Sequence, residues 1–426
     1  MVPDWSDPVP PEAVLEHIVA GTDLIVPLAV GEPVGLLDAV ESAADRLEGV
    51  RVHQMHALID RAYLDGRHGS RLRHVSYFLS PVTRQHFHDG GIDFVPAHFS
   101  EVPLLLRHNC QRPLILAAAS PPDRHGYFSL GTNADYVASF VGRWPIFLEV
   151  NEQMPRTFGR NSVHVSQVLG WSRTDRPLVD VPPARPDDLD HAIAQLIAER
   201  VPDRATVQAG IGSIPNAVLA ALSGHRDLGI HTELISDGAV DLIESGVVTG
   251  VYKHRRPNQS VTTFALGTRR LYDFLHENPS IQFLPVEWVN DPRVIAQQPL
   301  MVSINATTEV DLLGQAASET IGGRYYSGSG GQADFARGAM FSEGGQGFLV
   351  TRSTTSDGAT SKIVSRLARG SVVTTLKNTV DKVVTEWGVA ELRGRSLTQR
   401  ARSLIDIAHP DFRAQLEREA RHLGYL

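Results

Sequence analysis

The sequence predicts an α/β protein made of two open α/β domains that are related to each other as an internal structural repeat. Its 426 residues are too many for one ordinary hydrophobic core. Apolar, strand-like runs alternate with helix-like stretches through both halves of the chain, and a proline-rich segment separates the halves. We therefore expect an N-terminal α/β domain over residues 1–186 and a C-terminal α/β domain over residues 187–426.

The separating segment is residues 171–186, which contain four prolines among arginine and aspartate residues. Proline fixes the backbone in an extended form and removes a hydrogen-bond donor, so a continuous helix or a central strand is not expected there. Residues 187–200 follow as a predicted helix, which Asp187 or Asp188 can cap and which carries an apolar stripe.

Both halves begin with the same order of features: an apolar strand, a glycine turn, a proline in the first turn of a helix, and an apolar helix. Residues 23–44 show this order in the first half and residues 205–222 in the second. A later match places His53 over His231, so that Met55 occupies the place of Glu233. Chance remains the alternative explanation, because strand–glycine–helix units recur throughout α/β proteins.

Three further apolar runs predict buried strands, at residues 114–119, 146–150 and 372–375. In open α/β sheets ligands bind in the crevice beyond the carboxyl ends of the strands. An active site is therefore expected where two such domains face each other.

Composition narrows the functional class. The chain is 42% hydrophobic and 21% charged, and it has no run near the roughly 20 apolar residues that cross a bilayer. Residues 1–7 lack the basic and apolar regions of a signal peptide, so a cytoplasmic protein without a membrane partner is expected. The net charge of −8 argues against nucleic acid as the main ligand.

Cys110 is the single cysteine of the chain, which excludes an intrachain disulfide and a cysteine-cluster metal site. A buried small residue is the more common role of such a cysteine, and a nucleophile is the less common one. The histidines, among them His53, show no zinc-type spacing to nearby acids or cysteines, so we expect no metal site.

Glu233 is the candidate catalytic residue. It follows a predicted strand end and precedes a turn and a predicted helix over residues 239–244, so it stands where substrate reaches an open α/β sheet. A glutamate in this position taken alone is more often a surface acid or a ribose ligand. His231 lies two residues away; a hydrogen-bonded core histidine is an equally good interpretation of it.

Two glycine-rich segments offer backbone N–H groups to an anion. Residues 210–215 form a turn at a predicted helix N-terminus, but they lack the third glycine of the dinucleotide fingerprint and the Gly-Lys ending of a phosphate-binding NTPase loop. Residues 327–335 are the densest glycine cluster, and a flexible surface loop is the alternative there. Residues 350–355 and 360–364 follow as hydroxyl-rich segments with basic residues, suited to a phosphorylated ligand or to edge strands.

Taken together, these segments resemble the acetyl-CoA hydrolase/transferase family, in particular its shorter members of the 4-hydroxybutyrate CoA-transferase type. The resemblance covers nearly the whole chain. The ordered motifs that carry it are residues 31–33, 99–103, 120–126, 149–157, 210–215, 231–233, 309–315, 330–335, 384–394 and 407–413. Arg124 and the Asn305-Ala306 pair depart mildly from the family pattern, which leaves the acyl pocket open to variation.

The resemblance implies two α/β domains of the CoA-transferase fold, assembled as homodimers or larger homo-oligomers. It implies that Glu233 is the nucleophile of a ping-pong transfer of coenzyme A, without a metal, between an acyl-CoA and a short-chain carboxylic acid such as acetate, butyrate or 4-hydroxybutyrate. The coenzyme A ligands that it implies are Gly210, Ile211, Gly212, Ser213, Ile214, Gly331, Thr354 and Lys362. The acid is expected to contact residues 99–103 and 154–157.

Three other functions remain open at this stage. The nearest is an acyl-CoA (acetyl-CoA) hydrolase that uses the same glutamate with water as the acceptor. A nucleotide-binding oxidoreductase is suggested by the strand–Gly-x-Gly–helix order, although the missing third glycine counts against it. A non-catalytic sensor of coenzyme A or of sugar phosphates would need no nucleophile, and Glu233 counts against it.

Overall fold

The computed structural model of the chain describes residues 7–426, so nearly all of the amino-terminal segment discussed above lies outside the described residues. The chain forms two compact units. Unit 1 contains the residues up to Pro182 and a later stretch, Val261–Val289, and unit 2 contains Pro183–Ser260 and Asn290–Leu426. The first crossing between the units lies four residues before the expected position after residue 186. The return of Val261–Val289 to unit 1 was not expected from the sequence.

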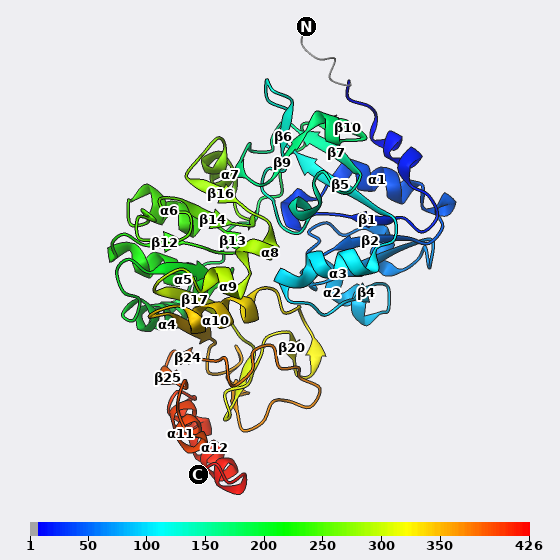
Figure 1. Cartoon of the computed structure of the whole chain (residues 1–426). Helices are drawn as coiled ribbons and strands as arrows, with labels where there is room; N and C mark the ends of the chain where they lie inside the picture. Colours follow the sequence, from blue (N-terminus) through cyan, green and yellow to red (C-terminus); the bar gives the residue numbers. More distant parts are fainter. Residues whose placement is uncertain (1–6) are drawn as a thin grey trace. The chain divides into compact units, whose positions relative to one another are not determined.

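Unit 1 contains a seven-stranded, fully parallel sheet in the order β10-β7-β5-β1-β2-β3-β4 (Figure 1). Its strands are β1 (Asp23–Ile25), β2 (Val50–Gln54), β3 (Leu72–Ser76), β4 (Asp93–Phe94), β5 (Pro113–Ala119), β7 (Ile146–Asn151) and β10 (Gly170–Thr174). The central strands β5 and β7 are buried almost throughout, which confirms the strands expected at residues 114–119 and 146–150. Strand β10 lies at the edge, as its proline-rich continuation requires.

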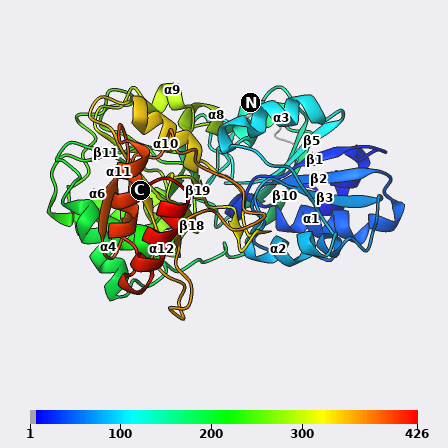
Figure 2. The same ribbon diagram turned by 90° about the horizontal axis from the view of Figure 1, so that it is seen from below.

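Three helices connect the strands of this sheet: α1 (Val34–Ser42), α2 (Pro81–His88) and α3 (Val102–Asn109). The strand order runs one way from β1 to β4 and the other way from β5 to β10. Right-handed crossovers therefore put α1 and α2 on one face and α3 on the other, as Figure 2 shows. The order reverses between β1 and β5, and the carboxyl ends of these two strands form the switch point of the unit.

Unit 2 contains a six-stranded sheet in the order β12-β11-β17-β22-β24-β25, parallel except for the last strand. The strands are β11 (Thr206–Ala209), β12 (Gly229–Ile230), β17 (Met301–Ala306), β22 (Gln346–Val350), β24 (Lys382–Thr385) and β25 (Gly388–Glu391). The helices are α4 (Asp188–Ala198), α5 (Ser213–Ala221), α6 (Asp237–Glu244), α9 (Pro292–Ile295), α10 (Gln332–Phe341), α11 (Leu397–Asp406) and α12 (Pro410–His422). Helices α11 and α12 lie side by side in both views and close an apolar cluster that includes Val383, Leu404 and Leu416 (Figures 1 and 2).

Short elements complete both units. Those of unit 1 are β6 (Tyr127–Ser129), β8 (Phe158–Gly159), β9 (Ser162–His164), β15 (Phe264–Ala265), α7 (Arg269–Leu275), β16 (Ile281–Phe283) and α8 (Val286–Val289). Those of unit 2 are β13 (Leu234–Ile235), β18 (Glu309–Asp311), β19 (Ala316–Ala317), β20 (Thr320–Ile321), β21 (Arg324–Tyr325) and β23 (Ile363–Val364). Strand β14 (Ser260–Thr262) begins at the second crossing, and 3-10 turns link several of these elements.

The expected helix after the proline-rich segment is confirmed as α4. Asp187 is its N-cap and accepts hydrogen bonds from the backbone N–H groups of Leu189 and Asp190, both at 3.1 Å. Ile193 and Ile197 are buried, but Leu189 is 43% exposed and does not belong to the buried stripe.

The strand expected at residues 372–375 is wrong. Only Thr375 forms an isolated bridge, to Ala316, and Val373 is 38% exposed. The backbone N–H groups of Thr374 and Thr375 both donate to the carbonyl of Ala316, and Thr375 accepts from the N–H of Ala316, so pairing with this single residue does not extend into a ladder.

The two sheets share a strand plan, since β2-β1-β5-β7-β10 and β12-β11-β17-β22-β24 follow the same order along the chain and in space. In unit 1 Val52 pairs with Leu24, and in unit 2 Ile230, which precedes His231 as Val52 precedes His53, pairs with Val207. The internal repeat stays a prediction, which the shared strand order supports.

None of the helices among residues 7–426 has both the length and the apolar character that crossing a membrane requires.

Candidate active site

Glu233 lies at a bend between β12 and β13, beyond the carboxyl end of β12. The side chain is half-buried, and its Oε2 accepts a hydrogen bond of 2.9 Å from Nδ2 of Asn290. The backbone N–H of Gly331 donates a second hydrogen bond to the same carboxylate. Two donors from distant parts of unit 2 thus converge on one acid.

Gly331 is the residue before α10, so its N–H belongs to the open first turn of that helix. Its φ of −98° is ordinary, and the reason for glycine is space. A Cβ here would collide with Oε2 of Glu233 and with Nδ2 of Asn290. The first residue of α10 is fixed in turn, because Nε2 of Gln332 donates to Ser318 Oγ at 2.8 Å and to Thr375 Oγ1 at 3.0 Å.

Asn290 was missed by the sequence analysis. It is fully buried, and its Oδ1 has no hydrogen-bond partner among the described residues. A buried amide oxygen without a partner is rare, and such groups concentrate at functional sites. An asparagine between Val289 and Asp291 carries no motif, so only the fold reveals its contact with Glu233.

Burial raises the pKa of Glu233 from its ordinary value of 4.5 to about 7. The hydrogen bonds from Asn290 and Gly331 favour the charged carboxylate and oppose this effect of burial. The result is an acid that is about half ionised at neutral pH and more basic than an exposed glutamate. Perturbed carboxylates of this kind are typical of functional sites.

His231 is a buried core residue in this structure. Its Nδ1 lies 3.3 Å from Nε2 of Gln298, and its ring meets that of Phe335 edge to face, with centroids 6.2 Å apart. Gln298 Oε1 accepts from the backbone N–H groups of His254 and Arg255. His231 therefore packs the Glu233 segment against α10, which begins beside Gly331.

The glycine turn at residues 210–214 lies between β11 and α5, at the strand next to β12. Gly212 has a φ of +123°, which favours glycine, and no side chain caps the first turn of α5. A Cβ at Gly210 would meet nothing within 4 Å, and Ile211 is 52% exposed. The turn touches the Glu233 segment through Thr232 Oγ1, which donates to the carbonyl of Ala209 at 3.4 Å.

Thr354 and Lys362 line a separate open cleft of about 550 Å³ in unit 2. Burial, followed by the charge of Arg352, lowers the pKa of Lys362. Arg352 is held by Asp190 and Asp187 at 2.8 and 2.9 Å. The lining residues are mostly hydroxyl-bearing or basic: Thr307, Thr308, Thr320, Arg352, Thr354, Thr355, Ser356, Thr360, Ser361, Lys362 and Arg366.

The structure thus brings Gly331 to Glu233 and groups Thr354 with Lys362, while the 210–214 turn forms a third site in the same unit. Ser318 Oγ accepts from Gln332, the residue after Gly331, and donates to Thr307 of the cleft at 3.1 Å. Common use of the three sites by one ligand stays a prediction.

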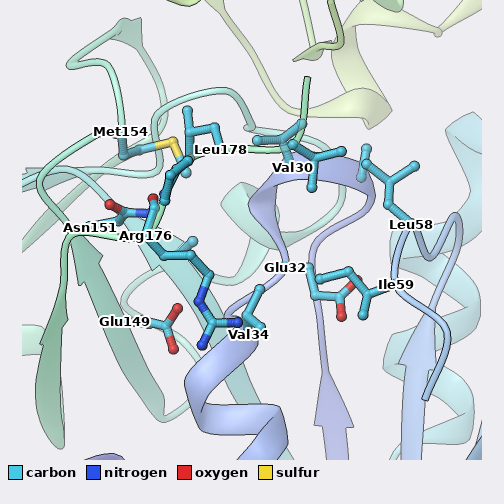
Figure 3. Close-up of a pocket in the computed structure, with 14 residues that line it drawn as sticks. Val30, Glu32, Val34, Leu58, Ile59, Glu149, Asn151, Met154, Arg176 and Leu178 are labelled. Atoms are coloured by element: carbon cyan, nitrogen blue, oxygen red, sulfur yellow. The ribbon is translucent and has the colours of Figure 1, made fainter. Parts of the chain in front are cut away.

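Unit 1 has its own small cavity, of about 60 Å³, at the switch point between β1 and β5. Figure 3 shows Arg176 reaching toward Glu149, with Glu32 on the opposite side. Glu149 Oε2 accepts from the backbone N–H of Leu36 at 3.0 Å, and burial raises its pKa. Met154, one of the residues expected to contact an acid, lines this cavity, whereas residues 99–103 do not.

Comparisons with known proteins match both halves of the chain. Residues 9–182 match the model of the acetyl-CoA hydrolase/transferase N-terminal domain, and residues 267–420 match that of the C-terminal domain. The chain is 45% identical to the succinyl-CoA:cyclohexane-1-carboxylate CoA transferase of Geobacter metallireducens, over 96% of this chain and 93% of that protein. It is 41% identical to the 4-hydroxybutyrate coenzyme A transferase of Clostridium kluyveri, over 92% of each.

Among solved structures, RipA from Yersinia pestis superimposes with a TM-score of 0.93 at 36% identity, over 98% of each chain. The overall α/β architecture expected from the sequence is therefore confirmed.

Proposed function

The chain belongs to the acetyl-CoA hydrolase/transferase family and is a CoA-transferase, and from that premise we propose that it transfers coenzyme A through a thioester on Glu233. The donor is an acyl-CoA and the acceptor is a short-chain carboxylic acid, with acetate, butyrate and 4-hydroxybutyrate as the candidates. The observation that carries this proposal is the pair of donors, Asn290 and Gly331, that hydrogen-bond the carboxylate of a basic, half-buried glutamate.

The first half-reaction begins when Oε1 of Glu233 attacks the thioester carbonyl of the acyl-CoA. Coenzyme A leaves as its thiolate and a mixed anhydride remains on Glu233. The thiolate then attacks the side-chain carbonyl carbon of Glu233, and the first acid leaves as a carboxylate. The acceptor carboxylate reverses these two steps on the glutamyl-CoA thioester, and no step uses a metal.

Each attack on the carbonyl carbon of Glu233 places negative charge on Oε2. Asn290 Nδ2 is already 2.9 Å from that oxygen, and the Gly331 N–H donates to the same group. One donor of this kind contributes about 3 kcal/mol to transition-state stabilisation. With Asn290 on Oε2, the proposal takes Oε1 as the oxygen that bonds to the acyl group.

The raised pKa of Glu233 supports its role as nucleophile. A carboxylate removed from water is less stabilised and more basic than one in solvent, which favours attack on a thioester. The same exclusion of water limits hydrolysis of the anhydride and of the glutamyl thioester.

Coenzyme A is assigned to the three ligand sites expected from the sequence. Residues 210–214 offer open N–H groups at the start of α5, which suit a phosphate or a developing oxyanion. The cleft around Thr354 and Lys362 offers hydroxyl groups and a basic rim. The cytoplasmic location and the homo-oligomeric assembly expected from the sequence remain proposals.

An acyl-CoA hydrolase with the same glutamate remains the second candidate, because water and a carboxylate compete for the same anhydride. Purified protein is incubated with an acyl-CoA, with and without acetate, and both the loss of the substrate and the formation of acetyl-CoA are followed. The proposal predicts loss that depends on the carboxylate and ceases in Glu233→Gln. The matched variant Glu199→Gln, an exposed acid at the end of α4, should retain activity.

Two outcomes contradict the proposal. Equal loss of acyl-CoA without any carboxylate identifies a hydrolase. Unchanged turnover in Glu233→Gln removes Glu233 from the chemistry.

A further inference from the structure

Three side chains capable of binding a metal converge in unit 1, away from Glu233 in the sequence. Asp23 is the first residue of β1, His53 lies on β2, and Cys110 precedes β5 by three residues. Strand β1 lies between β2 and β5 in the sheet (Figure 1). The side chains of His53, on β2, and of Cys110, before β5, both approach that of Asp23. All three side chains are buried, at 0%, 2% and 8% exposure.

The donor atoms have the spacing of a tetrahedral metal site. Nε2 of His53 lies 3.3 Å from Oδ1 of Asp23 and 3.8 Å from Sγ of Cys110, and the donor atoms of all three residues lie within 4.8 Å of one another. Tetrahedral zinc with ordinary bond lengths separates an imidazole nitrogen by about 3.4 Å from a carboxylate oxygen and by about 3.6 Å from a thiolate sulfur. The observed distances differ from these by a few tenths of an ångström.

The surroundings orient these donors. Nδ1 of His53 lies 2.9 Å from the hydroxyl of Tyr77, so the imidazole can donate from Nδ1 and present Nε2 as a metal ligand. The other oxygen of Asp23, Oδ2, accepts the backbone N–H of Gln111 at 2.8 Å. Arg51 holds Oδ1 through both Nε at 2.8 Å and Nη2 at 2.6 Å, so a metal bound to this oxygen would have to replace one of these contacts.

We propose that Asp23, His53 and Cys110 bind one divalent transition-metal ion of the zinc type, with a fourth position open to water. One thiolate, one imidazole and one carboxylate suit zinc, and the sulfur and nitrogen donors disfavour magnesium and calcium, which take oxygen ligands. The ion would tie β1 and β2 to the segment between α3 and β5, near the amino end of β1. The proposal is independent of the chemistry assigned to Glu233.

Binding of the ion would also replace one hydrogen bond and one proton at this site. His53 and Asp23 share a hydrogen bond, which coordination would replace. Coordination would also remove the proton of the Cys110 thiol, because the thiolate is the form that binds a metal. Only ions with a high affinity for thiolate can do so, which again selects zinc-type ions over magnesium.

Cobalt(II) serves as the probe, because a cobalt–thiolate bond gives an intense charge-transfer absorption that nitrogen and oxygen ligands do not. The full-length protein is stripped with a chelator and titrated with Co²⁺, and Zn²⁺ is then added as the competitor. We expect a charge-transfer band that saturates at one Co²⁺ per chain and disappears with Zn²⁺. The unfolding temperature should also rise with Zn²⁺.

Cys110→Ser should abolish the charge-transfer band and the rise in unfolding temperature. The matched control is His108→Gln, which removes an exposed histidine two residues from Cys110 and should leave both signals unchanged. The absence of a thiolate band in the wild-type protein overturns the proposal whether or not the variants fold. A band that persists in Cys110→Ser, or is lost in His108→Gln, overturns it as well.

Discussion

Replacing Asn290 with alanine separates two effects that this residue has on Glu233. The change removes the Nδ2 donor that lies 2.9 Å from Oε2. A hydrogen bond to a charged group contributes about 1.5–3 kcal/mol, which corresponds to roughly 1–2 pKa units. The pKa of Glu233 should therefore rise from about 7 to roughly 8–9.

This shift lowers the rate only where it leaves Glu233 protonated. At neutral pH the wild-type carboxylate is about half ionised, and the variant would be ionised to roughly 1–10%, so the rate falls by about 5- to 50-fold from ionisation alone. At alkaline pH both proteins are ionised and this loss disappears. The loss of the oxyanion donor is different, because it persists at every pH and lowers kcat by roughly 10²–10³-fold.

The assay is the pH profile of kcat and kcat/KM for CoA transfer in the wild type and in Asn290→Ala. We expect the acid limb of the variant to move to higher pH and its alkaline plateau to remain at least 10²-fold below that of the wild type. Asn278→Ala is the matched control, since Asn278 bonds to Phe274 and Ser280 and not to Glu233. A plateau equal to that of the wild type would refute the role of Asn290 as an oxyanion donor.

Three further predictions concern Gly331, Glu233 and Lys362. Gly331→Ala should reduce kcat by at least 10²-fold, because its Cβ collides with the Glu233 carboxylate. The control Gly347→Ala, whose Cβ would make only ordinary contacts, should leave kcat unchanged. Equal kinetics in the two variants would contradict this explanation. Glu233 has a raised folded-state pKa, so its contribution to stability falls as pH rises from about 4.5 to about 7. The free energy of unfolding of Glu233→Gln, relative to that of the wild type, should therefore increase by up to about 3 kcal/mol across this range. A difference between the two proteins that stays constant with pH in urea unfolding would show that the pKa is not raised. Lys362→Ala should raise KM for an acyl-CoA several-fold and leave KM for an acyl-pantetheine, which lacks the nucleotide, unchanged; an equal change for both substrates would place coenzyme A elsewhere.

Much of the architecture follows from local sequence patterns. The apolar runs of β5 and β7, the Asp187 cap of α4 and the glycine turn before α5 depend on neighbouring residues, and each is found where it was expected. Glu233 also follows a strand end in the structure, because a polar residue between an apolar strand and a helix marks that junction.

The remaining features depend on contacts between residues far apart in the chain. Asn290 reaches Glu233 across 57 positions, and no local pattern distinguishes it from other asparagines. The metal-type cluster joins Asp23 and His53, from two strands, with Cys110, which follows α3, so its spacing resembles no sequence motif. The residues 372–375 have a strand-like composition but only a single bridging partner, because pairing is decided by neighbours in space.

The most direct test of the account is to trap the intermediate on Glu233. The protein is incubated with an acyl-CoA and no acceptor, its intact mass is measured, and the sample is then reduced with borohydride and digested. The account predicts an added mass of one coenzyme A on the intact chain and, after reduction, a peptide in which the Glu233 side chain has become an alcohol, both absent from Glu233→Gln. A coenzyme A adduct at another residue, or turnover without any trappable adduct, would contradict the glutamyl thioester.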